Sequence, residues 1–582
     1  MFNQKRLKFT FIFFFILLAF ILFDIFQLQT TEYQLTSEII DQQNLDKFYI
    51  TAPRGEIFDA NGEKIAETKL EPHLFMNMRK ITNENSSDYR QIIQYNFPDL
   101  TTIEINEIFE SKDILQFVIN LSSIEYEITN NLLTNFDAFL IIDLPIRNYI
   151  KNELFAHTIG YLGIPNQDEF NNFQNAFGNN QVGKNGLERY YEDYLSGIPG
   201  ELTFLGSEII DSKQPTPGRD LFLSIDSSTQ LITKESLQQG IDLANKSFES
   251  INEIKRGASV VLDIETGNII SMISLPDFNP NKFVSGITDF EYKQLDRDQA
   301  FNNFAIQGLY PPGSVFKVVA YWLAVSESLY PEGLNNKDSK VDCEGSLSFG
   351  FDDGSQQVYN DWKLDGHGKV DLTNAIKQSC NVYFWDIALN IWRNFGNTEG
   401  ESILQEYSKE LGFSEKTNVD LPFEKVGIIP DRDLFEEWKI SRPGLVREEG
   451  WLGGDLMNLI IGQGAITTTP LQVANAYRTL ITGENLSPTL NINAEKITNN
   501  KINVSDEFIS FLLRDLNTVT NKGGTAYASF SILGNKANDI GGKTGTAQNA
   551  GDKNNTSWFV GVDSISNPKY IIVTVVDEGG SG

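Results

Sequence analysis

A long hydrophobic stretch lies close to the N-terminus of the chain. Residues 9–28 are apolar except for Thr10, Asp24 and Gln27, and three basic residues stand between positions 5 and 8. About 20 residues at roughly 1.5 Å each span a hydrocarbon core of about 30 Å. Basic residues stay on the cytoplasmic side of a membrane. The pattern predicts a cytoplasmic tail over 1–8 and a transmembrane anchor over 9–28. A cleaved signal peptide would need small residues at its cleavage site, whereas residues 24–28 are Asp-Ile-Phe-Gln-Leu, so an uncleaved anchor is favoured.

The segments after the anchor are more polar and less regular. Residues 31–50 are predicted to form a polar helical stalk, and residues 51–62 a short strand that ends in an Asn-Gly turn. Proline and glycine interrupt the pattern over residues 212–218, which indicates a domain boundary. We therefore expect one domain over 29–215 and a second over 216–582.

The second domain opens and closes with β-rich runs. Residues 259–264 and 268–273 are separated by a short turn and predict a hairpin, and residues 556–562 and 570–576 predict two more strands. The stretches between them are helical. In one of them, over 471–481, Thr469 can cap the helix and Pro470 fits its first turn. Strands at both ends with helices between them predict an α+β fold, with an antiparallel sheet flanked by helices.

Composition limits the class of protein. A chain of 582 residues is too long for one core and suggests two or three domains. A hydrophobic content of 41% is that of a folded protein. The formal charge of -31 argues against a nucleic-acid partner, because phosphate binding needs a basic surface. Anionic lipid would also repel such a chain, so its attachment to a membrane must be hydrophobic. Two cysteines do not make a disulfide framework.

The first candidate chemical motif runs from Ser314 to Lys317. It follows a rigid turn over residues 310–313 and opens an apolar helical run over 318–324. Positions three apart share a helix face, so Lys317 is expected beside Ser314. A desolvated neutral lysine can take the proton of a serine hydroxyl, and a helix N-terminus favours developing negative charge. Such a pair also arises by chance in long chains and is weak evidence alone.

Two further motifs follow in order. Ser379-Cys380-Asn381 can place a hydroxyl and a carboxamide on the same side of a loop, although such a run is more often a cap or turn. Lys543-Thr544-Gly545-Thr546 favours a strand that another backbone can approach, with a lysine and hydroxyls to hold a carboxylate. The ordered set of all three is a known signature of penicillin-binding proteins and β-lactamases. A histidine triad is disfavoured, because only His367 of the three histidines lies in this region.

On these motifs the chain resembles class B penicillin-binding proteins, and within them the elongation branch, penicillin-binding protein 2. The resemblance runs from the anchor almost to the C-terminus. It is carried by the following segments: Arg54 to Gly62, Gly183 to Glu188, Leu309 to Ser314, Asp361-Trp362-Lys363 with Gly366-His367-Gly368, Ile461 to Gly464, and Thr469 to Gln472. It implies an elongated non-catalytic pedestal, also called the dimerisation domain, over 29–215. It also implies a penicilloyl-serine transferase domain over 216–582.

The resemblance also implies an activity and roles for the motif residues. The expected reaction is peptidoglycan D,D-transpeptidation during cell elongation and shape maintenance, with penicillin as an inhibitor and no cofactor for the chemistry. Ser314 would form an acyl-enzyme with the donor stem peptide, Lys317 would be the base and Ser379 would relay the proton. Asn381 would bind the substrate amide. The carboxylate would be bound by Lys543, Thr544, Gly545 and Thr546, and the backbone N–H groups of Ser314 and Thr546 would form the oxyanion hole.

Location and partners follow from the same resemblance. The chain is expected to cross the inner membrane once, with its catalytic domain in the periplasm. Stem peptides and β-lactams are the expected ligands, and a SEDS-family glycosyltransferase and other elongation-complex proteins are the expected partners. In the family a further helix follows the last strand. The sequence ending at Gly582 is therefore expected to be incomplete or to leave a sheet face bare.

Four potential metal ligands lie in one short window that contains both cysteines. Cys343, Asp361, His367 and Cys380 would complete a tetrahedral structural zinc site. Some elongation-type relatives are similar in carrying zinc at matching positions. A Cys343–Cys380 disulfide and a pair of free buried thiols remain as alternatives.

Three other functions remain open alongside the elongation transpeptidase. The chain could be a division-type member of the family, a non-catalytic β-lactam-binding scaffold or sensor, or a β-lactamase. The complete set of motif residues disfavours the scaffold. The pedestal and the anchor disfavour a β-lactamase.

Overall fold

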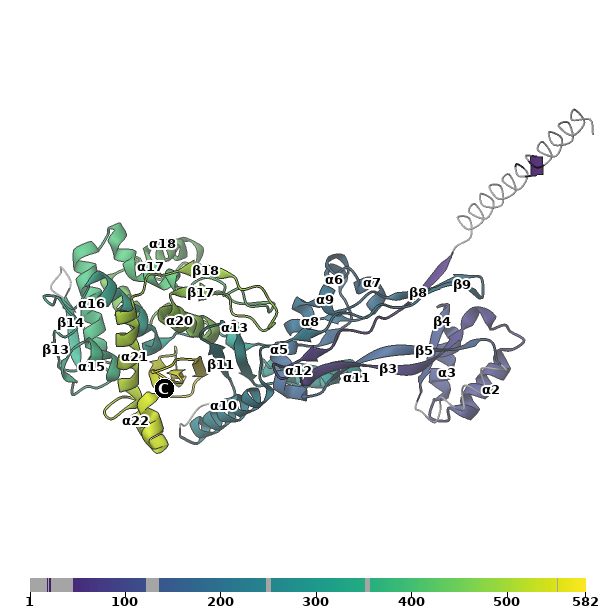
Figure 1. The fold of residues 1–582 in the computed structure, drawn as a ribbon, viewed down its shortest axis with the longest axis horizontal. Coiled ribbons are helices and arrows are strands. Elements are labelled where there is room, and N and C mark those ends of the chain that lie inside the picture. The colour runs from purple at the N-terminus through teal and green to yellow at the C-terminus, as the bar shows by residue number, and fades with distance from the viewer. Residues whose placement is uncertain are drawn as a thin grey trace, which may run out of the picture.

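The computed structural model describes residues 45–121, 136–247, 253–350, 356–551 and 553–582, together with residues 18, 20, 21 and 23. The described part is elongated, with a pedestal of long strands at one end and a larger C-terminal lobe at the other (Figure 1). The predicted tail and almost all of the predicted anchor fall outside the described residues. Within the parts that are described, no helix has the length and apolar character needed to cross a membrane.

Most strands of the pedestal belong to two sheets, in which all pairings are antiparallel except the parallel pairing of β10 with β2. The longest pairing joins β3 to β5 from Ala66–Tyr149 to Met76–Phe139. The bounds of its strands are β1 (Asp46–Ile50), β2 (Ile57–Phe58), β3 (Lys64–Asn77), β4 (Leu115–Asn120), β5 (Phe139–Tyr149), β6 (Leu162–Gly163), β7 (Val182–Gly183), β8 (Gly200–Leu205), β9 (Glu208–Lys213) and β10 (Leu221–Phe222). In one sheet the order is β1-β8-β9, and in the other β10-β2-β3-β4, with β5 also on β3.

The prediction of a helical stalk over residues 31–50 was wrong where the structure describes it. Residues 46–50 form β1, which pairs with β8. The side chains alternate as a strand requires, since Phe48 packs edge-on against Phe75 and Ile50 is buried. The partner strand lies more than 150 residues away in the sequence, so local polarity alone could not indicate it. The predicted strand and Asn-Gly turn over 51–62 were confirmed as β2 and the turn before β3.

Short helices cover the pedestal. Two of them, α2 and α3, pack with β3 and β4 around a separate small core that contains Met76, Ile93 and Ile105. The pedestal helices are α2 (Ser86–Asn96), α3 (Thr102–Glu110), α5 (Ala156–Ile159), α6 (Gln167–Asn172), α7 (Ala176–Asn179), α8 (Gly186–Tyr190) and α9 (Glu192–Leu195), with 3₁₀ turns at Met78–Lys80 and Asn152–Phe155.

A buried cluster of charges lies in the pedestal. Arg54 contacts the carboxylates of Glu188 at 2.8 Å and Glu192 at 2.9 Å, and Arg147 contacts Glu188 at 2.8 Å. None of these four side chains is more than 7% exposed. Two cations and two anions therefore balance one another inside the protein, which is the arrangement that buried charges require.

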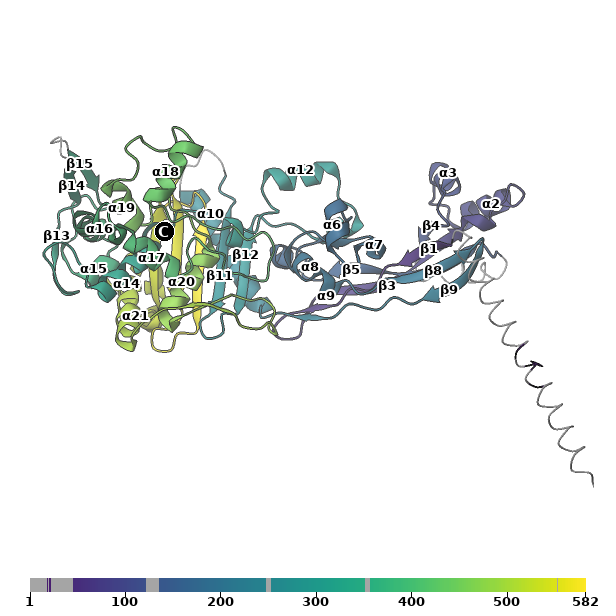
Figure 2. The same ribbon diagram turned by 90° about the horizontal axis from the view of Figure 1, so that it is seen from above.

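The C-terminal lobe contains a five-stranded antiparallel sheet in the order β12-β11-β21-β20-β19. Its strands β12 and β11 lie nearest the pedestal (Figure 2). The predicted hairpin and the two C-terminal strands were confirmed. The bounds are β11 (Gly257–Asp263), β12 (Ile269–Leu275), β19 (Gly541–Ala547), β20 (Thr556–Val562) and β21 (Tyr570–Val576).

Helices cover both faces of this sheet. On one face α10 (Ser227–Ser247) packs Leu237 and Ile241 against Ile273 and Leu275. On the other face α20 (Pro470–Thr482) belongs to the main core. The predicted cap of α20 was confirmed, since Thr469 accepts a hydrogen bond from Gln472 N at 3.2 Å. Strand β11 is buried at every residue except the last, as expected for a strand that helices cover on both faces.

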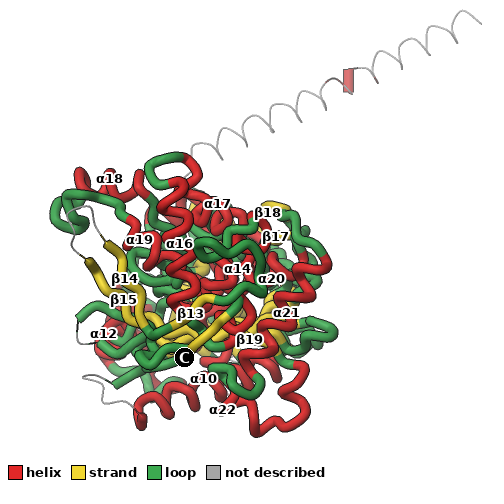
Figure 3. Tube along the Cα trace, turned by 90° about the vertical axis from the view of Figure 1, so that its left-hand side faces the viewer, coloured by secondary structure: helices red, strands yellow, loops and turns green. Residues whose placement is uncertain are grey.

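The remaining elements form a helical part of the lobe beyond the sheet. Small hairpins cover its far end, where β13, β14 and β15 face the viewer in Figure 3. The helices are α11 (Asn281–Ser285), α12 (Asp289–Arg297), α13 (Phe304–Gln307), α14 (Lys317–Glu327), α15 (Leu372–Lys377), α16 (Asn381–Phe395), α17 (Ile403–Glu410), α18 (Arg432–Ser441), α19 (Gly453–Ile460), α21 (Asp506–Thr520) and α22 (Tyr527–Phe530). The short strands are β13 (Val341–Cys343), β14 (Ser346–Gly350), β15 (Gln356–Asn360), β16 (Gly368–Val370), β17 (Glu484–Leu486) and β18 (Thr498–Lys501), and the 3₁₀ turns are Gly313–Phe316, Glu399–Ser402 and Ser531–Asp539.

Candidate active site

Ser314 lies in a tight turn that leads into a buried helix. Residues Gly313–Phe316 form a 3₁₀ turn and α14 begins at Lys317, as the apolar run predicted. Positions three apart nearly eclipse one another in such a turn, which places Ser314 and Lys317 on one side. Gly313 has a φ of 54°, and a Cβ there would lie 2.7 Å from the carbonyl oxygen of Thr546. The turn therefore needs glycine in order to approach β19 this closely.

The amine of Lys317 is fully buried beneath the second motif. It donates hydrogen bonds to Ser379 O at 2.8 Å, Ser379 Oγ at 3.2 Å and Asn381 Oδ1 at 2.6 Å. Burial lowers the pKa of Lys317 to about 8, because it disfavours the charged ammonium. A lysine with such a pKa loses its proton far more readily near neutral pH than an exposed lysine does.

The amine of Lys543 reaches the same hydroxyl from the sheet. Its Nζ donates to Ser379 Oγ at 3.0 Å and to Thr544 O at 3.0 Å. Burial, and then the neighbouring charge of Lys317, hold the pKa of Lys543 well below its ordinary value. Ser379 Oγ therefore lies between two lysine amines, within hydrogen-bonding distance of each.

The backbone of the second motif is held in an uncommon conformation. Ser379 has a φ of 55°, in the left-handed region that few non-glycine residues adopt. Trp362 Nε1 donates to its carbonyl oxygen at 3.2 Å. Asn381 was expected in a loop but is the first residue of α16, and Asp361 Oδ2 accepts from its N–H at 2.8 Å. A carboxylate at a helix N-terminus is favourable, so Asp361 fixes where the helix and the Asn381 side chain begin.

The three predicted motifs meet at one cavity of about 620 Å³. Lys317 and Lys543 lie buried beneath it, and Gly545 pairs with Trp558 inside the sheet. Since β19 is the last strand of the sheet, no further strand of the described chain pairs with its outer edge, and Gln463 contacts that edge only at the end of the strand. The cavity is lined by Ser314, Asn360, Asp361, Trp362, Ser379, Asn381, Ile461, Gln463, Thr525, Thr544, Thr546, Gln548, Asn555, Ser581 and Gly582.

Nine lining residues were not predicted as site residues: Asn360, Trp362, Ile461, Gln463, Thr525, Gln548, Asn555, Ser581 and Gly582. Gln463 and Trp362 stand inside segments that had carried the family resemblance, so their motifs were a signal that could have placed them in the site. Thr525 has no such signal. Its Oγ1 lies 2.7 Å from Thr544 Oγ1, a contact that only the packing of α21 beside β19 creates.

The four predicted metal ligands form one buried cluster. Their ligand atoms all lie within 4.8 Å of one another. His367 Nε2 lies 3.4 Å from Asp361 Oδ1, and the other ring nitrogen, Nδ1, lies 3.0 Å from Gln378 Oε1. The Sγ atoms of Cys343 and Cys380 are 3.2 Å apart, and both cysteines are free thiols. A disulfide bond would bring the two sulfurs to about 2.05 Å.

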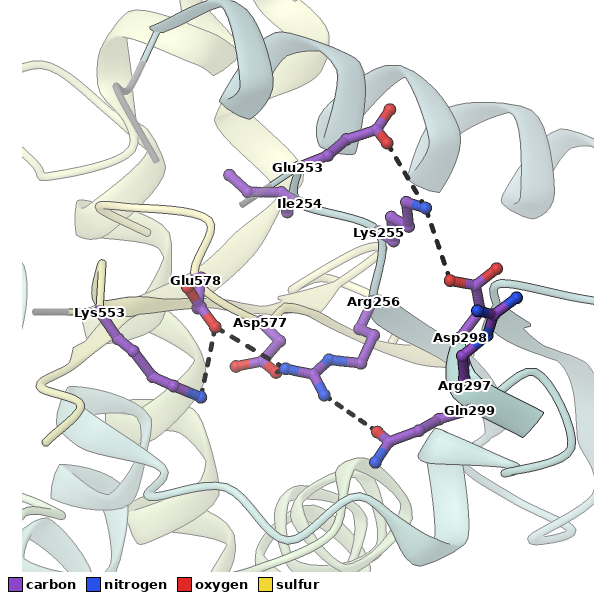
Figure 4. A pocket seen from close by; sticks show the side chains of 10 residues that line it. All are labelled: Glu253, Ile254, Lys255, Arg256, Arg297, Asp298, Gln299, Lys553, Asp577 and Glu578. Carbon is purple, nitrogen blue, oxygen red and sulfur yellow. Dashed lines mark hydrogen bonds and ion pairs between the residues drawn. The ribbon is translucent and has the colours of Figure 1, made fainter. Parts of the chain in front are cut away.

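A second cavity of about 480 Å³ lies apart from the three motifs (Figure 4). Its charges pair with one another, since Arg256 contacts Asp577 at 2.8 Å and Lys553 contacts Glu578 at 3.4 Å. Lys255 lies 3.6 Å from Asp298. Hydroxyl nucleophiles do not line this cavity. It is lined by Glu253, Ile254, Lys255, Arg256, Arg297, Asp298, Gln299, Lys553, Asp577 and Glu578. We therefore assign the chemistry to the first cavity.

Two protein-family descriptions match the chain. "Penicillin binding protein transpeptidase domain" matches residues 257–582, which hold the sheet and all three motifs. "Penicillin-binding Protein dimerisation domain" matches residues 49–223, which form the pedestal. The second match extends through β10, which pairs with β2 in the pedestal.

Curated and solved proteins resemble the chain over most of its length. The peptidoglycan D,D-transpeptidase MrdA of Acinetobacter baumannii is 31% identical over 466 residues, covering 77% of this chain and 63% of that relative. The MrdA of Haemophilus influenzae is 29% identical over 75% of this chain and 67% of the relative. The penicillin-binding protein PBP2 of Helicobacter pylori, solved in complex with MreC, has a TM-score of 0.74 at 27% identity, covering 92% of this chain and 96% of that one.

Proposed function

We propose that this chain, which belongs to the penicillin-binding protein transpeptidase family, is a peptidoglycan D,D-transpeptidase of cell elongation. One observation carries the proposal. Lys317, Ser379, Asn381 and Lys543 form a single hydrogen-bonded network beneath the cavity that Ser314 lines. The names of the relatives and the segment that leads into Ser314 favour elongation over a division-type role.

The acylation step uses a neutral amine beneath the nucleophile. Ser314 Oγ attacks the carbonyl carbon of the penultimate D-Ala of a donor stem peptide, and its proton passes to the neutral Lys317. The C–N bond of the terminal D-Ala then breaks, and Ser379 passes a proton to the leaving amine. The proton comes back to Ser379 from the lysine amines that contact it. Backbone N–H groups of Ser314 and Thr546 stabilise the oxyanion.

In the second step, protons are transferred through the same groups in the opposite direction. A side-chain amine of a neighbouring stem peptide attacks the acyl carbon and forms the new amide bond. The proton that it loses passes through the same network, and Ser314 Oγ recovers a proton as the ester bond breaks. No oxidant, reductant or cofactor is needed for either step.

The free edge of β19 supports the proposed mode of substrate binding. An extended peptide can add to this edge as a further strand, with its carboxylate towards the hydroxyls of Thr544 and Thr546 and the amine of Lys543. Asn381 Oδ1 and Nδ2 would bind an amide of the donor. The two hydroxyls line the cavity, which is the arrangement that such binding requires.

The proposal extends to location and partners. We assign residues 1–8 to a cytoplasmic tail, 9–28 to an anchor in the inner membrane, 29–215 to the pedestal and 216–582 to a periplasmic catalytic domain. The Helicobacter pylori relative was solved with MreC, so a protein of that kind is a partner we propose for the pedestal. A SEDS-family glycosyltransferase would polymerise the strands that this chain cross-links.

A cross-linking assay tests this function. The purified chain is incubated with a pentapeptide donor that ends in D-Ala-D-Ala and with an acceptor stem peptide. We expect released D-Ala and a cross-linked product in equal amounts, and neither with Ser314→Ala. Ser529→Ala, which alters an exposed serine on α22, is the matched control and should stay active. Acylation by penicillin without any cross-linked product would instead favour the scaffold or sensor.

The cluster of Cys343, Asp361, His367 and Cys380 fits a structural zinc ion. Two thiols, an imidazole and a carboxylate converge from separate segments, and Gln378 orients the ring so that Nε2 faces the cluster. When bound, zinc would cross-link these segments without entering the reaction. Because Asp361 also binds the first N–H of α16, the cluster positions the loop of Ser379 and Asn381.

Metal analysis tests the zinc site. We expect about one zinc per purified chain, and a large loss in Cys343→Ser. Asp365→Asn changes an exposed carboxylate of the same loop and should retain the metal. An equal metal content in both variants would contradict the site, and a disulfide found by thiol titration would replace it.

A further inference from the structure

The last residues of β19 meet a carboxamide in place of a neighbouring strand. Gln463 Nε2 donates to Thr546 O at 3.2 Å, and Gln548 N donates to Gln463 Oε1 at 3.3 Å. An edge strand otherwise leaves such N–H and C=O groups unpaired. One side chain thus pairs two successive outward-facing backbone groups, as the peptide group of an added strand would.

The turn that carries Gln463 is itself fastened to the turn of the nucleophile. Gly313 N donates to Gly462 O at 2.8 Å. Gly462 has a φ of 72°, and a Cβ there would lie 2.2 Å from Gly313 O. Two further hydrogen bonds, from Gly462 N to Leu459 O at 2.8 Å and from Gln463 N to Asn458 O at 2.9 Å, hold this turn to the end of α19.

These contacts close a ring around the reacting groups. The ring runs from Gly313 to Gly462, through the side chain of Gln463 to Thr546, and back to Gly313, where a Cβ would lie 2.7 Å from Thr546 O. The two backbone N–H groups proposed for the oxyanion hole belong to Ser314 and Thr546. Each of them is therefore attached to one end of the ring. Behind it, Trp558 Nε1 donates to Pro311 O at 3.0 Å, which ties the turn to β20, the strand that pairs with the end of β19.

We propose that Gln463 is a positioning residue that sets the spacing between the two N–H donors of the oxyanion hole. This inference rests on the proposed transpeptidase function and deepens it. Without the carboxamide, the end of β19 keeps its pairing with β20 but loses its tie to the nucleophile turn. Thr546 N–H then moves relative to Ser314 when charge develops on the substrate oxygen. The substitution therefore destabilises the transition state more than the ground state, because the two N–H groups bind the developing oxyanion more strongly than the neutral carbonyl oxygen.

The expected size follows from the chemistry of such donors. Removing one oxyanion-hole donor outright lowers kcat by about 10²–10³-fold, and a misplacement of about 1 Å can cost about 10²-fold. Since Gln463→Met displaces a donor and does not remove it, we expect an acylation rate constant lowered by about 10- to 100-fold. The dissociation constant of the complex before acylation should stay within about twofold, because the carboxylate and amide contacts do not involve Gln463.

The chain provides a matched control. Gln307 uses its carboxamide in the same way, since Nε2 donates to Phe423 O at 3.2 Å and Oε1 accepts from Asn303 N at 2.9 Å. It does not line the catalytic cavity. Gln307→Met therefore removes the same pair of bonds without touching the ring.

The experiment measures acylation by benzylpenicillin in stopped flow for the wild type, Gln463→Met and Gln307→Met. It also compares an ester donor with its thionoester, in which sulfur replaces the carbonyl oxygen. We expect Gln463→Met alone to lose acylation rate. We also expect it to lose part of the preference for oxygen over sulfur, since that preference reports on the oxyanion hole.

Three results would overturn the inference. The first is an acylation rate constant of Gln463→Met within twofold of the wild type, and the second is weaker binding before acylation with an unchanged rate constant. The third is an unchanged preference for the oxygen ester over the thionoester. The second would make Gln463 a substrate contact, and the third would make its role merely structural. A wild-type chain that penicillin does not acylate would instead refute the proposed function.

Discussion

The buried charge cluster of the pedestal allows a sharp prediction for stability. We expect Glu188→Gln to destabilise the chain strongly, although it replaces one oxygen-bearing side chain with another of the same shape. The Glu188 carboxylate is fully buried and contacts both Arg54 and Arg147 at 2.8 Å. The amide keeps an acceptor but loses the charge.

The magnitude follows from the balance of charge. In the wild type two guanidinium groups face the carboxylates of Glu188 and Glu192, and all four side chains are at most 7% exposed. The substitution leaves one positive charge without a counterpart in a region that water does not reach. Removing one partner of a buried ion pair costs about 3–5 kcal/mol. At about 2–4 °C for each kcal/mol, the pedestal transition should fall by about 6–20 °C.

The effect should depend on pH with a defined sign. Burial opposes the ionisation of Glu188, but Arg147 and Arg54 outweigh it and hold its pKa below the ordinary value of 4.5. A carboxylate with a lowered pKa in the folded state contributes its full stability above the unfolded pKa, and loses it as the pH falls through the folded value. The difference in free energy of unfolding between the wild type and Glu188→Gln should therefore be constant near neutral pH. It should become smaller below about pH 4.5.

Differential scanning calorimetry measures the shift of the unfolding transition, with Glu201→Gln as the control. Glu201 contacts Lys47 at 3.0 Å, but the lysine side chain is 46% exposed. Exposed pairs contribute only about 0–1 kcal/mol. Arg147→Met added to Glu188→Gln should recover part of the loss, since it removes the unbalanced charge. If Glu188→Gln shifted the transition no more than Glu201→Gln, the reasoning from buried charge would be refuted.

Three further predictions concern the C-terminal lobe. Acylation by penicillin should accelerate as the pH rises through about 8, because burial lowers the pKa of the proposed base Lys317 to that value. An acylation rate that stays flat from about pH 6 to 9 would contradict this. Thr525→Val removes the hydroxyl that lies 2.7 Å from Thr544 Oγ1. This should raise KM about tenfold, and only for donors with a free carboxylate. An equal rise in KM for amidated donors would argue against a role of Thr525 in carboxylate binding. Leu516→Ala empties a fully buried position on α21 and should cost about 2–5 kcal/mol in urea denaturation; a loss below about 1 kcal/mol would mean that the site collapses around the cavity.

The strands of the catalytic sheet could be predicted because their signal is local. Residues 556–562 and 570–576 are rich in β-branched and aromatic side chains, and the structure bears out both strands to the residue. The helix over 471–481 was equally accessible, since its cap and first-turn proline stand next to it in the sequence. Hydrophobic pattern and capping therefore sufficed for two strands of the catalytic sheet and for a helix of the main core.

The elements that the sequence could not indicate depend on distant partners. Residues 46–50 became a strand only because β8 lies beside them, and Thr525 entered the site through its contact with Thr544. Asn381 begins a helix because Asp361, 20 positions earlier, binds its N–H. In contrast, the four potential metal ligands could be proposed together because their donor atoms are chemically distinctive, whatever the fold between them.

Mass spectrometry of the chain after treatment with penicillin tests the central claim most directly. The account predicts one covalent adduct with the full mass of the drug, on the peptide that contains Ser314, and none in Ser314→Ala that remains folded. An adduct on another residue, or no adduct on the wild-type chain, would contradict the assignment of Ser314 as the nucleophile.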